Sequence, residues 1–111
     1  MTYNLRFLPG LEEDAFAGYS WYEDKSPGLG EEFLRMFYAC AAELQRDALL
    51  YRKIHGEFRR RLLRRFPYAI YYKLEGKEII VFGFFHCARD PRTVKSKLKA
   101  RHLEEITKTG P

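Results

Sequence analysis

The sequence contains few of the residues that build metal or disulfide sites. Its 111 residues include only two cysteines, Cys40 and Cys87, and three scattered histidines. Neither cysteine has a CxxC or Cys/His partner at ligand spacing. Two reduced thiols, packed as small apolar groups, are therefore expected instead of a disulfide or a zinc site. We expect no metal and no cofactor.

Long hydrophobic runs are also missing. No uncharged apolar stretch approaches the roughly 20 residues that span a bilayer. The first residues carry Arg6 and then Glu12-Glu13-Asp14, without the basic flank and apolar stretch of a secretory signal. A cytoplasmic protein without a membrane partner is expected. The 46% hydrophobic residues, with 18 aromatics, suffice for a single compact core.

Acidic residues become scarce after residue 50. Residues 1–50 hold four lysines and arginines against nine aspartates and glutamates, a balance of −5. Residues 51–111 hold sixteen against six, a balance of +10. This asymmetry favours a basic face for an anionic partner, which would be RNA, DNA or an acidic protein segment. The alternative is that these charges only keep the surface soluble.

The hydrophobic pattern of the first half predicts a strand and two helices. Residues 3–8 alternate as a strand, and residues 11–24 and 28–47 have helical spacing. Ser26 is the expected N-cap of the second helix, with Pro27 at its first position. The short connection makes the helices an antiparallel hairpin. The clearest apolar stripe consists of Leu29, Phe33, Met36, Phe37, Cys40 and Leu44.

The second half changes to the two-residue period of strands. Residues 58–66, 68–74 and 78–86 are three predicted strands, with a bend at Pro67 and a tight turn at Gly76. Residues 79–85 are apolar on both faces, as in a covered central strand. Residues 93–106 form a terminal helix or a partly ordered tail. The side chains expected in the core include Phe33, Phe37, Leu44, Ile70, Val81 and Phe82.

The resulting order, β-α-α-β-β-β, predicts an α+β fold with the helical hairpin on one face of a small, mostly antiparallel sheet. Several segments of the sequence also match a known family. They are Trp21-Tyr22-Glu23, Ser26-Pro27-Gly28-Leu29-Gly30, Phe33-Leu34, Arg64 through Tyr72, Phe85-His86 and Arg89-Asp90-Pro91. In these segments the sequence resembles the RelE/ParE family of type II toxin–antitoxin toxins, in its ParE-like branch. The resemblance covers residues 3–91, which defines an expected toxin domain at 1–91 and a basic C-terminal helix or tail at 92–111.

The resemblance implies a toxin neutralised by a cognate antitoxin. Members of the ParE-like branch inhibit DNA gyrase and are not enzymes, whereas RelE-like members cleave mRNA on the ribosome. A third possibility is a non-toxic binding module, such as a decayed toxin. We expect the ParE-like, non-enzymatic activity.

An arginine cluster supplies the expected binding residues. On a strand, Arg59, Arg61 and Arg65 share one face, which should therefore be basic and outside the core. Arginine suits phosphate and carboxylate because its planar fork binds two oxygens at once. The alternative is a solvated edge that discourages aggregation. The predicted target- and antitoxin-binding residues are Arg59, Arg61, Arg64, Arg65 and Arg89.

Catalytic candidates are limited to Arg89, His86 and Arg60. The resemblance places Arg89 where ribosome-dependent nucleases carry an arginine that assists cleavage, and Arg60 at one basic position of the second strand. His86 offers a general acid or base, although it also fits a plain strand end. The departures are Leu62 at a second basic position, Ala69 at a further arginine and Lys95 at a tyrosine. Such losses should remove transition-state stabilisation.

Overall fold

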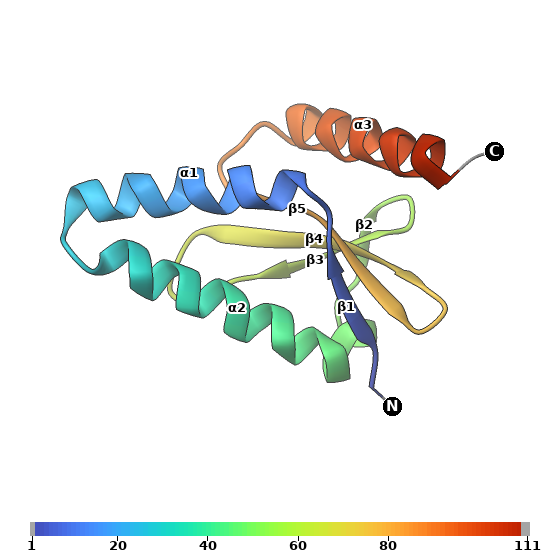
Figure 1. The fold of residues 1–111 in the computed structure, drawn as a ribbon, viewed down its shortest axis with the longest axis horizontal. Helices are drawn as coiled ribbons and strands as arrows, with labels where there is room; N and C mark the ends of the chain where they lie inside the picture. Colours follow the sequence, from blue (N-terminus) through green and yellow to red (C-terminus); the bar gives the residue numbers. More distant parts are fainter. Residues whose placement is uncertain (1, 110–111) are drawn as a thin grey trace.

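The computed structural model of the protein describes residues 2–109. Along the described residues, one strand is followed by two helices, a 3-10 turn, four strands and a last helix (Figure 1). In chain order they are β1 (Asn4–Phe7), α1 (Gly10–Lys25), α2 (Leu29–Asp47), η1 (Ala48–Leu50), β2 (Lys53–His55), β3 (Phe58–Leu62), β4 (Tyr68–Glu75), β5 (Glu78–His86) and α3 (Pro91–Thr109).

One five-stranded sheet has the order β1-β5-β4-β3-β2. Only the β1–β5 pair is parallel, and the other neighbours are antiparallel. The predicted fold class is therefore confirmed. Residues 79–85 are all buried on β5, which lies between β1 and β4. The prediction of a central strand covered on both faces is also confirmed, because a continuous apolar run needs cover on each side.

The helical hairpin of α1 and α2 packs on one face of the sheet (Figure 1). Phe84 of β5 lies with its ring centroid 5.3 Å from that of Phe33 and 4.3 Å from that of Phe37, both on α2. All six side chains predicted for the core are at most 2% exposed: Phe33, Phe37, Leu44, Ile70, Val81 and Phe82.

The C-terminal helix α3 packs against Gly83 and Phe85 of β5, whereas Phe84 between them faces the hairpin. Its Val94 and Leu98 are buried. A Cβ on Gly83 would lie 2.5 Å from the Phe85 ring and 3.3 Å from Leu98, so the glycine lets α3 approach the strand closely. The predicted terminal helix is thus confirmed, while residues 110–111 of the expected tail lie outside the described residues.

The predicted strand 58–66 is wrong beyond Leu62, where β3 ends. The Leu63 N–H donates to the Tyr68 carbonyl at 2.8 Å, so residues 63–67 turn back toward β4. Arg65 has a φ of +76° within this turn, and Phe66 faces inward against Phe33 at a centroid distance of 5.4 Å. Local alternation predicted too long a strand, because burial of Phe66 requires the chain to bend before Pro67.

The N-terminus of α2 also differs from its prediction. The helix begins at Leu29, preceded by Gly28 with a φ of +90°, and Ser26 makes no capping hydrogen bond. Instead the Glu23 carboxylate accepts from the backbone N–H of Gly28 at 3.0 Å and of Gly30 at 3.0 Å. Its negative charge satisfies unpaired N–H groups at the positive end of the helix. The short strand β2 was not predicted at all.

Candidate functional site

The arginines of β3 and the following turn hold that edge of the sheet to α2. Arg61 is only 4% exposed, and its Nη1 donates to the Cys40 carbonyl at 2.7 Å. Its Nη2 forms an ion pair with Glu43. Arg64 reaches the other oxygen of the same carboxylate at 3.1 Å. Two guanidinium groups therefore share one glutamate of α2, which neutralises much of the predicted basic face.

The two remaining arginines of this face also have partners within the protein. Arg65 pairs with Glu32 at 3.1 Å, and Arg59 donates to the Tyr51 carbonyl at 2.6 Å. The sequence-based expectation that this face lies outside the core is therefore wrong for Arg61. The sequence did contain a signal for these pairings. Glu32 and Glu43 are eleven residues apart, which is about three helical turns, so both carboxylates lie on one side of α2.

The pKa shifts of Glu43 and Arg64 agree with these ion pairs. The guanidinium groups of Arg64 and Arg61 lower the pKa of Glu43 to about 2, because their hydrogen bonds and charges favour the carboxylate. The same carboxylate raises the pKa of Arg64. Arg61, Arg64 and Glu43 thus form a structural triad that fixes β3 against α2.

Two of the three catalytic candidates, His86 and Arg89, line one open cleft of about 440 Å³ beside α1 and α3. The Arg89 guanidinium carbon lies 5.2 Å from the centre of the Phe85 ring. His86 Nδ1 accepts a hydrogen bond from the Ala88 N–H at 2.9 Å, and its ring lies 5.3 Å from that of Tyr68. Arg60 does not line this cleft, so the structure brings together only two of the three.

This cleft is lined by three cations, Arg89, Lys97 and Arg101, and by the imidazole of His86, which is its candidate for moving a proton. Burial raises the pKa of Tyr68 despite the opposing effect of Arg89, so the phenol stays protonated at neutral pH. The buried carboxylate of the cleft, Asp14, is engaged by Arg101 at 2.7 Å. Asp90 pairs with Arg92 instead of Arg89. The arrangement can hold an anion, with Arg89 as its exposed cation.

The outer side of the helical hairpin exposes large apolar groups. Phe16 is 67% and Tyr38 is 57% exposed, and both line a shallow groove between α1 and α2 with Ala15, Tyr19 and Leu34. We call this the hairpin groove. Exposed apolar clusters on soluble proteins mark surfaces that bind partners.

A second hollow, of about 490 Å³, lies at the β2–β3 edge and is lined by Leu50, Leu62, Arg60 and Arg64 among others. Leu50 is 76% and Leu62 is 54% exposed. We call this the edge hollow. Basic and apolar side chains alternate around it, which suits a segment that carries both carboxylates and apolar anchors.

Within residues 2–109, no group of three or more His, Cys, Asp and Glu side chains is placed to hold a metal ion. Cys40 and Cys87 are both free thiols. Cys40 is buried as predicted, but Cys87 is exposed beyond the end of β5, so the prediction of two packed thiols is wrong for Cys87. No helix in this part of the chain is both long and apolar enough to cross a membrane.

Known proteins resemble this chain both in sequence and in fold. No protein-family model matches the chain. It is 25% identical over 105 residues to Toxin ParE2 of Mycobacterium tuberculosis, in both strain CDC 1551 / Oshkosh and strain H37Rv, covering 94% of this chain and 100% of that toxin. A solved structure, "Chromosomal ParDE TA system from P. aeruginosa", superposes with a TM-score of 0.70 at 19% identity, covering 77% of this chain and 96% of that chain.

The class of fold follows from these findings: a small α+β domain with a helical hairpin on a mostly antiparallel sheet, as in the solved ParDE structure. Within that class the chain is ParE-like, in sequence over nearly its whole length and in fold. The resemblance to the RelE/ParE toxins predicted from the sequence is confirmed.

Proposed function

We propose that this chain is the toxin of a type II toxin–antitoxin pair, that it acts in the cytoplasm, and that it inhibits DNA gyrase without enzymatic chemistry. The observation that carries the proposal is the similarity to Toxin ParE2, which extends over 94% of the chain. A similarity confined to the core strands would reflect the fold alone. This one also includes the exposed helical hairpin and the C-terminal region.

A cognate antitoxin would cover the exposed apolar surface. The hairpin groove and the edge hollow present Phe16, Tyr38, Leu50 and Leu62 to solvent, which is unfavourable for an isolated protein. An amphipathic, partly disordered segment would bury these groups as it folds. Arg64 and Arg65 are exposed at the rim between α2 and the β3–β4 turn but already pair with Glu43 and Glu32, so burial of the apolar groups carries this proposal.

The choice of a gyrase-type inhibitor over a nuclease rests on the chemistry of the cleft. Ala69 is fully buried, so the position where the nucleases carry an arginine offers no cation. Lys95 lines a hollow on the other side of α3 from the cleft that holds Arg89. An arginine side chain stays protonated in proteins and therefore cannot serve as a general base. Binding, not bond cleavage, is what these side chains support.

The mRNA endonuclease stays as a second candidate because Arg89 and His86 share one open cleft. A nuclease needs a cation near the scissile phosphate and a group that moves a proton, and these two residue types can supply both. The two candidates predict different first events in the cell.

The deciding experiment induces the chain without any antitoxin and follows plasmid supercoiling and mapped mRNA ends at early times. Gyrase inhibition predicts altered supercoiling and DNA-damage signalling while mRNA stays intact. Cleavage of translated messages at defined codon positions, abolished by Arg89→Ala but not by Arg92→Ala, would establish the nuclease instead. Arg92 is the matched control because it is exposed and lies three residues away. If growth continues and neither readout moves, the chain is a non-toxic binding module.

A further inference from the structure

A cationic hollow lies between α3 and the β2–β3 hairpin, apart from the surfaces described above. It measures about 440 Å³, and we call it the α3 groove. Its charged and titratable lining comes from three elements and one turn: Lys73 of β4, Lys95, Lys99 and His102 of α3, His55 of β2, and Glu57. Lys73 lies deepest, with Nζ 5.4 Å from the centre of the Phe58 ring and 3.4 Å from His102 Nδ1.

The protein neutralises only part of the positive charge of the α3 groove: the pKa of Glu57 is lowered by its hydrogen bond with Lys53 and further by the charge of Lys73. Glu57 is the one carboxylate of the lining, and it is already held by Lys53 at 3.0 Å. Among residues 2–109 no carboxylate forms an ion pair with Lys95 or Lys99, nor with Arg60, which is exposed on the neighbouring strand. The arginines on the hairpin side, by contrast, pair with glutamates of α2.

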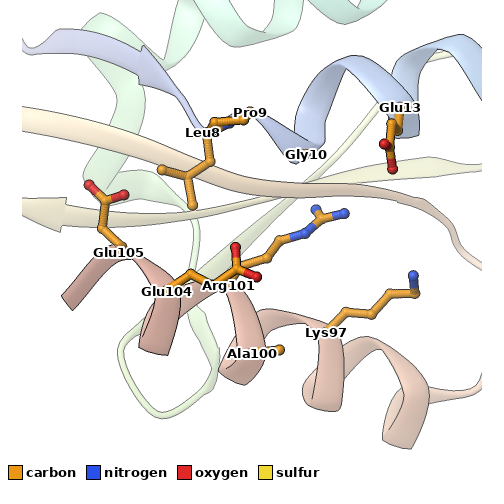
Figure 2. A pocket seen from close by; sticks show the side chains of 9 residues that line it. All are labelled: Leu8, Pro9, Gly10, Glu13, Lys97, Ala100, Arg101, Glu104 and Glu105. Atoms are coloured by element: carbon orange, nitrogen blue, oxygen red, sulfur yellow. The ribbon is translucent and has the colours of Figure 1, made fainter. Parts of the chain in front are cut away.

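The opposite side of α3 carries acidic as well as basic residues, so the excess of positive charge lies on the side of the α3 groove. Figure 2 shows the pocket between α3 and the start of α1, which is lined by Lys97 and Arg101 together with Glu13, Glu104 and Glu105. There three carboxylates stand against two cations. Lysines at 95 and 99 therefore border an acid-poor groove, while Lys97 of the same helix borders an acid-rich one.

The histidine of the groove responds to this concentration of charge. Burial lowers the pKa of His55, and the charges of Lys95 and Arg60 lower it further. Both cations thus act on the same imidazole from α3 and from β3. A bound anion would relieve this repulsion between like charges.

The lining distinguishes between anionic partners. A protein segment needs apolar anchors at the centre of its interface, but Leu98 and Phe58 are already buried by α3 itself. Single-stranded nucleic acid is typically held by exposed aromatic rings that stack on its bases. Here Phe58 and Phe82 are covered, and the His102 ring packs edge-on against Phe58. The exposed part of the lining therefore offers cations, which can bind phosphates, but no apolar anchors and no aromatic rings for stacking.

We propose that the α3 groove binds the phosphate backbone of duplex DNA, independently of base sequence, with Lys73, Lys95 and Lys99 of its lining as contacting cations. Arg60, which lies outside the groove and also lines the edge hollow, is the fourth. This binding goes beyond the proposed inhibition of gyrase and rests on charge placement alone. The chain could therefore prove toxic without binding DNA, or bind DNA without being toxic. Lysine and arginine contacts of this kind position a protein on a duplex without reading its sequence.

Fluorescence anisotropy with a labelled random-sequence duplex tests the proposal on the purified full chain over a series of KCl concentrations. Four phosphate contacts predict that log K falls with log[salt] with a slope of about −3 to −4. The double variant Lys95→Glu, Lys99→Glu should weaken binding at least about tenfold and reduce the slope by about 2. Both side chains are exposed, so thermal unfolding should match that of the unaltered chain.

The matched control is Lys97→Glu, which makes the same charge change on the same helix but on the acid-rich side. Lys97→Glu should weaken DNA binding much less than Lys95→Glu alone or Lys99→Glu alone. An equal loss would show that net charge, and not the α3 groove, holds the DNA. The proposal is also overturned if the duplex does not bind at low salt, if single strands bind more tightly, or if polyglutamate of equal charge competes as well as the duplex.

Discussion

Arg101 of α3 and Asp14 of α1 form a two-pronged ion pair, with Nη1–Oδ2 and Nη2–Oδ1 distances of 2.7 and 2.9 Å. Arg101 Nη1 also donates to the Phe82 carbonyl at 2.7 Å, and Asp14 accepts from the Phe84 N–H at 3.1 Å. The pair thus joins the first helix, the central strand and the last helix. A Cβ on Gly10 would lie 2.8 Å from the guanidinium, so that glycine leaves room for it.

Asp14→Asn should lower the free energy of unfolding by about 3 kcal/mol, because it leaves the largely buried Arg101 without its counter-charge. Chemical denaturation measures this change. Arg92→Met is the matched control, since its pair with Asp90 is exposed and should contribute under about 0.5 kcal/mol. Similar losses for the two variants would mean that α3 is not held by the Asp14 pair.

Stability should depend on acid pH through Glu43. Its folded-state pKa of about 2 lies below the ordinary value of 4.5, so the carboxylate contributes stability that is present above about pH 5 and is lost as the pH falls through 2. Glu43→Gln should therefore be less stable than the unaltered chain at pH 7, with the difference shrinking toward pH 2. Urea midpoints measured across this range test the sign. A constant difference would argue against the triad with Arg61 and Arg64.

Phe37→Ala should cost about 3–5 kcal/mol, because it removes a buried ring that packs against Phe84. Tyr38→Ala, one residue away and 57% exposed, should cost well under about 1 kcal/mol. Thermal or urea unfolding compares the two variants. Equal losses would contradict the assignment of Phe37 to the core and of Tyr38 to the outer side of the hairpin.

Antitoxin binding should depend on the hairpin groove. Phe16→Ala should weaken the complex at least about tenfold, as expected for an aromatic anchor at the centre of an interface. Titration calorimetry with the antitoxin encoded beside this chain measures the change. Leu103→Ala on α3 is the control, because Leu103 is similarly exposed at 62% but lies away from the groove. A complex that tolerates Phe16→Ala but not Leu103→Ala would move the antitoxin to α3.

The type and order of the secondary structure were predictable from the sequence because periodicity is a local property. The steps between Leu29, Phe33 and Phe37 define a helix face in any context, and the doubly apolar run 79–85 requires a covered strand. The boundaries at Leu62 and Leu29 were missed. The end of β3 depends on the packing of Phe66 against Phe33. The start of α2 depends on the Glu23 carboxylate, which accepts a hydrogen bond from the Gly30 N–H.

Which arginines are available to a partner was decided by the tertiary structure alone. The sequence predicted a basic face containing Arg61, yet the sheet register turns Arg61 toward α2, where Glu43 neutralises it. Arg60, one residue earlier, faces the other way and keeps its charge. In the same manner Arg101 meets Asp14 across 87 residues of sequence. Charge counts along a chain carry no information about such pairings, because an ion pair depends on distance in space and not on separation in sequence.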